Sequence, residues 1–144
     1  MPVVRDILAR KGSEVVTTGP DSSVLEAAQL MNTRGIGALL VVEADQPVGI
    51  FTERDVMRRV VVEGRDPATT PVRDVMTSRL TTAGLETTTD VCGALMTSQR
   101  IRHLPVLGPT GLAGIVTIGD LLAFQLAEQA VTIAQLNSYV YDVR

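Results

Sequence analysis

A seven-residue pattern occurs twice in this chain, and it constrains the fold more than any other feature. Residues 49–55 read Gly-Ile-Phe-Thr-Glu-Arg-Asp, and residues 114–120, which lie 65 positions later, read Gly-Ile-Val-Thr-Ile-Gly-Asp. The same register continues backwards, so that residues 35–42 correspond to residues 100–107. This spacing identifies an internal repeat of one supersecondary unit.

A looser similarity opens each half of the chain. Residues 4–8 resemble residues 72–76 at an offset of 68. We therefore divide the sequence into a first repeat with the N-terminal segment at 1–66, a second repeat at 67–124 and a C-terminal helical extension at 125–144.

Each repeat is expected to run strand, helix, strand, strand, helix. In the first repeat the β-branched segment 14–18 predicts a strand, and Ser23 with Glu26 forms a capping box that starts a helix. The apolar run 38–42 and residues 48–51 predict a hairpin. A second helix is expected from Thr52 until Gly64.

The second repeat follows the same order. We expect a weak strand at 79–82, a helix capped within 87–90, a hairpin of 104–107 with 112–116, and a helix from about 118 to about 141. This last helix carries an apolar stripe: Leu122, Leu126, Ala130, Ile133, Leu136 and Val140. Such a stripe either folds back on its own domain or packs on a partner chain, and we favour the partner.

Composition narrows the class of protein. The chain has 144 residues and is 45% hydrophobic, which suits one globular domain or two small halves with a shared core. No apolar run reaches the roughly 20 residues that span a bilayer, and no signal peptide is visible, so we expect a cytoplasmic protein without a membrane partner. A net charge of −3 and four aromatic residues disfavour nucleic-acid binding. The single cysteine, Cys92, is expected to be a buried thiol.

The tandem repeats, each with Gly-x-x-Thr-x-x-Asp at 49–55 or 114–120, resemble a pair of CBS domains, also called a Bateman module. The resemblance extends from about Val3 to Phe124. It implies an α+β fold with two β-α-β-β-α repeats related by pseudo-two-fold symmetry, followed by the long C-terminal helix. It also implies a stand-alone regulatory homodimer that binds adenosyl ligands in the clefts between repeats.

The repeated motif carries residues suited to a nucleotide. Asp55 and Asp120 each offer two carboxylate oxygens that can accept hydrogen bonds from both ribose hydroxyls. Thr52 and Thr117 stand where a strand meets a helix, where free backbone N–H groups favour an anion. The glycine at the start of each motif would let the chain approach a ligand. The alternative is that both Thr-x-x-Asp sequences are capping boxes that need no ligand.

A basic cluster distinguishes the two repeats. Arg100, Arg102 and His103 stand where the first repeat has the small segment 35–38. The resemblance assigns Arg102 and His103 to the phosphates of a nucleotide, with Arg54 as a further contact. The two sites are therefore not expected to be equivalent. The candidate ligand-binding residues are Thr17, Ile36, Gly37, Thr52, Arg54, Asp55, Ile101, Arg102, His103, Pro105, Thr117 and Asp120, of which Ile36 and Ile101 are placed to sandwich adenine.

The sequence thus predicts a sensor of AMP, ADP, ATP or NAD(H). Two alternatives stay open, namely a sensor of S-adenosylmethionine and a structural dimerisation module without a ligand. An enzyme is disfavoured, because no phosphate-binding loop, nucleophile elbow or histidine cluster for a metal is present in the sequence. We accordingly expect neither a catalytic cofactor nor a metal.

Overall fold

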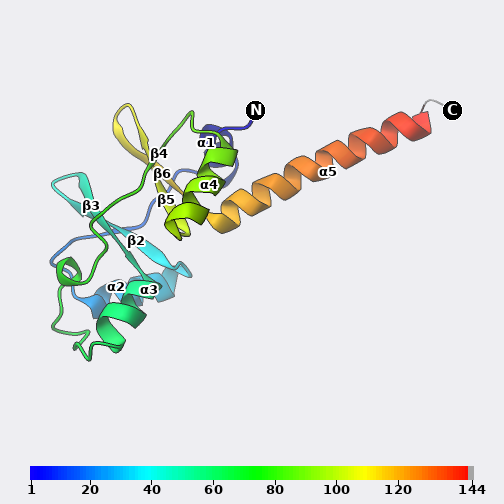
Figure 1. Ribbon diagram of the computed structural model, residues 1–144. Helices are drawn as coiled ribbons and strands as arrows, with labels where there is room; N and C mark the ends of the chain where they lie inside the picture. The colour runs from blue at the N-terminus through cyan, green and yellow to red at the C-terminus, as the bar shows by residue number, and fades with distance from the viewer. Residues whose placement is uncertain (143–144) are drawn as a thin grey trace.

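The computed structural model describes the backbone of residues 1–142 and the side chains of residues 1–137. The first repeat forms a three-stranded sheet (Figure 1). Its strand order is β1 (Thr17–Thr18), β2 (Ala38–Glu43) and β3 (Gln46–Thr52), with β1 parallel and β3 antiparallel to β2. The predicted hairpin is therefore present.

The second repeat builds the same sheet again. Its strands are β4 (Ala83–Gly84), β5 (His103–Gly108) and β6 (Gly111–Thr117), with the same parallel and antiparallel pairings. The α+β class and the two-fold repetition expected from the sequence are confirmed.

Helices α2 (Val24–Arg34) and α4 (Thr89–Gln99) occupy equivalent places in the two repeats. Each begins at a hydroxyl cap, because Ser23 Oγ accepts a hydrogen bond from the backbone N–H of Glu26 and Thr88 Oγ1 accepts one from Val91. These caps satisfy donors that the first helical turn leaves unpaired. The predicted helix starts are confirmed, but Ser23 and Glu26 make only this one bond of the expected capping box.

The first strand of each repeat needs correction: β1 is confined to the last two residues of the expected 14–18, and β4 lies just after the expected 79–82. Residues 17 and 18 pair with Leu40 and Val41, whereas in the second repeat Ala83 and Gly84 pair with Val106 and Leu107. Pro105 stands at the position of Leu40 and has no N–H to donate, so the second pairing starts one residue further along.

The predicted helix 52–64 is also different in form. It begins as one α-helical turn, α3 (Glu53–Asp55), and continues as a π-helix, η1 (Val56–Val61). The β-branched run from Val60 to Val62 disfavours a regular α-helix. The wider turn buries Val60 and leaves Val61 and Val62 mostly exposed.

Each hydrophobic core contains a segment that precedes the other repeat in the sequence. Helix α1 (Val4–Lys11) packs Val4, Ile7 and Leu8 into the core of the second repeat. The equivalent short helix η2 (Val72–Asp74) and the residues after it pack into the core of the first repeat. The N-terminal segment therefore packs against the second sheet, although it precedes the first repeat in the sequence. Neither core is complete without the other half of the chain.

The motif glycines leave room for these crossing segments. This corrects the expectation that they let the chain approach a ligand. A Cβ atom at Gly49 would lie 2.6 Å from Met76 Sδ and 3.0 Å from the carbonyl oxygen of Thr77. At Gly114 it would lie 2.8 Å from Leu8 Cδ2. Both glycines are buried, and the space beside each is filled by the crossing segment.

Helix α5 (Ile118–Asp142) starts in the second core and then projects away from both sheets (Figure 1). Leu121 and Phe124 are the α5 side chains in that core, whereas the expected Leu122 is 56% exposed. The helix does not fold back, since residues 128–137 are all exposed. The Val140 side chain of the predicted stripe lies outside the described residues. Among the residues that the structure describes, no helix is both long and apolar enough to cross a bilayer.

Candidate functional site

A cleft between the repeats, here called the first cleft, gathers most of the predicted site residues. It is partly open to solvent, and its cavity has a volume of about 150 Å³. Its lining residues come from the turn before β2, from the first motif, from the linker at residues 75–77 that follows η2, and from the turn before β5: Gly37, Ile50, Thr52, Glu53, Arg54, Asp55, Thr77, Arg100, Ile101, Arg102 and His103. Chain segments some fifty residues apart therefore meet at one site.

The second cleft is its counterpart under the repeat symmetry. It is lined by Lys11, Glu14, Val15, Val16, Gly35, Ile36, Gly37, Ala38, His103, Ile115 and Thr117. Each cleft thus combines the motif of one repeat with the pre-strand turn of the other. Gly37 and His103 line both clefts.

Both Thr-x-x-Asp motifs form capping boxes. The N–H of Thr52 donates to Asp55 Oδ2 at 3.0 Å, and the N–H of Asp55 donates to Thr52 Oγ1 at 3.2 Å. Thr117 and Asp120 make the same two bonds at 2.9 and 3.0 Å. The capping interpretation is confirmed, and it can coexist with ligand binding because each carboxylate has further lone pairs.

Most backbone N–H groups at these helix starts are not free, contrary to the expectation. Besides the capping bonds, the N–H of Glu53 donates to the carbonyl of Gly37, and the N–H of Ile118 donates to that of Arg102. The main chain at Thr52 and Thr117 is therefore already paired within the protein. Of the first motif's helix start, the N–H of Arg54 stays without a hydrogen-bond partner among the described residues, so an anion in the first cleft would be held by that group and by side chains.

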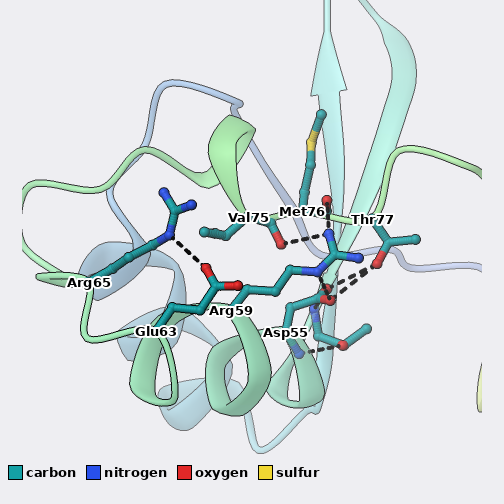
Figure 2. Close-up of polar contacts among 8 residues, drawn as sticks. Asp55, Arg59, Glu63, Arg65, Val75, Met76 and Thr77 are labelled. Carbon is teal, nitrogen blue, oxygen red and sulfur yellow. Dashed lines mark hydrogen bonds and ion pairs between the residues drawn. The ribbon is translucent and has the colours of Figure 1, made fainter.

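Asp55 is held by the linker as well as by its cap (Figure 2). The residue is 6% exposed, and the hydroxyl of Thr77 donates to its carboxylate at 3.2 Å. Arg59 Nε lies 3.8 Å from Asp55 Oδ1, and its Nη1 donates to the carbonyl of Met76 at 2.7 Å. Asp55 and Arg59 thus fasten the crossing segment to the first motif.

The first cleft is also lined by four residues that were not predicted from the sequence: Ile50, Glu53, Thr77 and Arg100. Thr77 directly follows the 72–76 similarity, but only its backbone pairing with Ile50 brings it to the cleft. No local pattern marks it.

The first cleft is also lined by basic residues. Arg54, Arg100 and Arg102 line it, and Arg54 Nη1 donates to the carbonyl of Arg100 at 3.1 Å. Arg100 ends α4 in the left-handed conformation, with φ 55°, where the first repeat has Gly35 with φ 65°. An arginine in a conformation that favours glycine strains the backbone and adds a cation beside Arg102. Three arginines against Glu53 and Asp55 favour an anionic ligand.

His103 stands between the two clefts and is not a fixed charge. Burial lowers its pKa below the ordinary value of 6.5, and Arg102 and Lys11 lower it further against the opposing effects of Glu53 and Asp120. The imidazole is therefore neutral at pH 7 and can both donate and accept a hydrogen bond. A phosphate group nearby would favour its protonated form.

The remaining candidates lie elsewhere. Ile36 and Thr117 line the second cleft, and Ile101 lines the first, so the two isoleucines do not enclose one common ring. Asp120 faces a separate pocket with Lys11 and Phe124. Thr17 is exposed in β1 and Pro105 is buried in β5, and neither lines the two clefts defined above.

The comparisons with known proteins agree with this architecture. The family model of the CBS domain matches twice, at residues 4–62 and 72–127. The chain belongs to the CBS-domain family. CBS pairs are regulatory modules, and both family matches include the segment that crosses to the other core.

Several CBS proteins span almost the same length. The CBS domain-containing protein YhcV of Bacillus subtilis is 34% identical, with 95% of each chain covered. A putative signal-transduction protein with CBS domains from Burkholderia ambifaria has a TM-score of 0.85 and 42% identity, covering 88% of this chain and 96% of that chain.

A more distant structure shares the fold. The CBS domain pair of the protein MJ0100, solved with 5′-methylthioadenosine and S-adenosyl-L-methionine, has a TM-score of 0.78 and 24% identity, covering 89% of this chain and 98% of that chain.

Proposed function

We propose that this chain is a regulatory module that binds an adenine nucleotide in the first cleft. The observation that carries the proposal is the meeting of Arg54, Arg100 and Arg102 with the carboxylate of Asp55 in one cleft between repeats. AMP, ADP, ATP and NAD(H) all combine a ribose with at least one phosphate. Binding would change the relative placement of the repeats or of α5. This change would alter the interaction with a partner protein.

Different residues of the first cleft suit different parts of a nucleotide. Asp55 keeps lone pairs for ribose hydroxyls beside its capping bond, and Thr77 can turn its hydroxyl away to make room. Ile50 and Ile101 offer apolar surface to an adenine ring. The arginines match phosphate oxygens, to which guanidinium groups form charge-assisted bonds.

The likeness to the CBS pair of MJ0100 concerns the fold, so the preference for a nucleotide rests on the cleft residues of this chain. S-adenosylmethionine has no phosphate for the three arginines. It remains the alternative ligand, and a module without a ligand remains the alternative function. The cytoplasmic location stays a prediction.

The test removes one arginine and leaves the caps intact. Arg102 is exposed, and the first repeat has Gly37 in its place, so Arg102→Ala is expected to fold normally. We expect its affinity for AMP to fall roughly 10- to 100-fold, because a hydrogen bond to a charged group contributes about 1.5–3 kcal/mol. Its affinity for adenosine should change little, because adenosine has no phosphate. Isothermal titration calorimetry measures both values.

The matched control is Arg79→Ala, which removes an exposed arginine outside the first cleft. A thermal-shift screen of the native chain against AMP, ADP, ATP, NAD, NADH and S-adenosylmethionine accompanies the titration. Stabilisation by S-adenosylmethionine alone would favour the alternative ligand. No stabilisation by any compound would favour the structural module.

We also propose that the chain is a homodimer joined through α5. Beyond the second core this helix carries Leu126, Ile133 and Leu136, each between 56% and 59% exposed, at the spacing of a helix-packing stripe. The double variant Leu126→Asp with Ile133→Asp is expected to be monomeric, because buried unpaired carboxylates oppose association. Sedimentation velocity should give about twice the 15.4 kDa chain mass for the native protein and the single mass for the variant. Gln135→Asp, on the opposite side of α5, serves as the control, and a monomeric native chain would contradict the proposal.

A further inference from the structure

The second cleft differs from the first in one decisive contact. Lys11 Nζ donates to Asp120 Oδ2 at 2.5 Å and to the carbonyl oxygen of Ile115 at 2.8 Å. Both side chains of this ion pair are about three quarters shielded, at 27% and 24% exposed. Solvent screening of the pair is therefore weaker than at an open surface.

Lys11 also separates Asp120 from the cleft. Lys11 lines the second cleft, together with Ile115 and Thr117, and it lines the neighbouring pocket that contains Asp120. Asp120 itself lines only that neighbouring pocket, whereas its repeat partner Asp55 lines the first cleft directly. The ammonium group thus stands between the carboxylate and the space where a ribose would have to lie.

We propose that Lys11 takes the place of a ligand at the Asp120 carboxylate. The native chain then binds one adenosyl ligand, in the first cleft, and none in the second. The inference rests on the proposed function, because it takes the nucleoside of the first cleft as the ligand class. Lys11 is then the residue that decides how many ligands the chain carries.

The cation beside Asp55 is placed differently, because Arg59 Nε lies 3.8 Å from Asp55 Oδ1 and Arg59 does not line the first cleft. Thr77 stands beside Asp55 where Lys11 stands beside Asp120, and a neutral hydroxyl can rotate away from a carboxylate at small cost. Displacing a lysine from a shielded carboxylate breaks a charge-assisted bond and leaves both charges to be paired again. Asp120 also holds its charge firmly, since burial raises its pKa but the bonds from Lys11 and Thr117 bring it below the ordinary value.

The other charged residues of the second cleft also favour a single bound nucleotide per chain. Its titratable lining residues are Lys11, Glu14 and His103, and Glu14 is paired with Arg34 at 2.5 Å. No arginine lines it, in contrast to the three in the first cleft. Removing Lys11 should therefore open the second cleft to a nucleoside without phosphate, and adenosine is the suitable probe.

The experiment counts adenosine molecules per chain by equilibrium dialysis. We expect one per native chain, two per Lys11→Ala chain and one per Lys11→Arg chain, which keeps the cation. Lys11→Gln, which removes the charge but keeps much of the length, should also bind two, with affinity for the second at least about tenfold above that of the native chain. The extra equivalent should disappear when Asp120→Asn is added to Lys11→Ala.

Two adenosines on the native chain, or an unchanged count in both Lys11→Ala and Lys11→Gln, would overturn the inference. A failure of the proposed function gives a different result, namely that the native chain shows no AMP binding that depends on Arg102. If the native chain binds no adenosine but Lys11→Ala binds one that depends on Asp120, the occupancy by Lys11 is supported while the first cleft is not.

Discussion

Gly49→Ala is expected to destabilise the chain by about 2 kcal/mol, the middle of the range for overpacking a filled core. The new methyl group would lie 2.6 Å from Met76 Sδ and 3.0 Å from the carbonyl oxygen of Thr77. Met76 can move its side chain, but the Thr77 carbonyl accepts a bond from Ile50 at 2.9 Å, so backbone pairing must also yield. The substitution therefore pushes the linker away from β3.

Urea denaturation measures this loss, with Gly19→Ala as the matched control, because the nearest atom to its Cβ would be Ser22 Oγ at 3.9 Å. Gly114→Ala should cost less than Gly49→Ala, since its closest neighbours are the side-chain methyls of Leu8. Equal stability of the Gly49→Ala and Gly19→Ala variants would contradict the packing role assigned to Gly49.

Asp55→Ala is expected to lower the free energy of unfolding by about 2–3 kcal/mol, as the loss of a cap and of buried hydrogen bonds predicts. The substitution removes the acceptor for the N–H of Thr52 and for the hydroxyl of Thr77 at a site that is 6% exposed. It also removes the carboxylate that faces Arg59. Asp55→Asn should lose less, because its amide oxygen can still accept the bond from Thr52.

The comparison variant is Asp120→Ala, whose carboxylate is more exposed and whose partner Lys11 can turn toward solvent. We expect this change to cost less than Asp55→Ala in the same urea titration. A larger loss at Asp120 than at Asp55 would contradict the account of the two caps. Because Asp55 stabilises the fold, Arg102 is the better residue for testing ligand binding.

Much of the fold could be predicted from local patterns. The repeat follows from its offset of 65, and the helix starts at Ser23 and within residues 87–90 and the two hairpins follow from residues near one another in the sequence. Capping depends on residues three positions apart, and hairpins depend on adjacent strands, so short segments suffice to specify them. The basic side of the candidate site was also visible, since Arg102 and His103 depart from the other repeat.

Only the tertiary structure decided which segments meet. The crossing of α1 and η2 to opposite cores places Thr77 beside Asp55 and Lys11 beside Asp120, and these last two residues lie 109 positions apart. The sequence determined that there are two similar motifs with two similar caps. It could not show that one carboxylate faces a cleft while the other is covered by a lysine, because that difference depends on long-range packing, which local spacing does not encode.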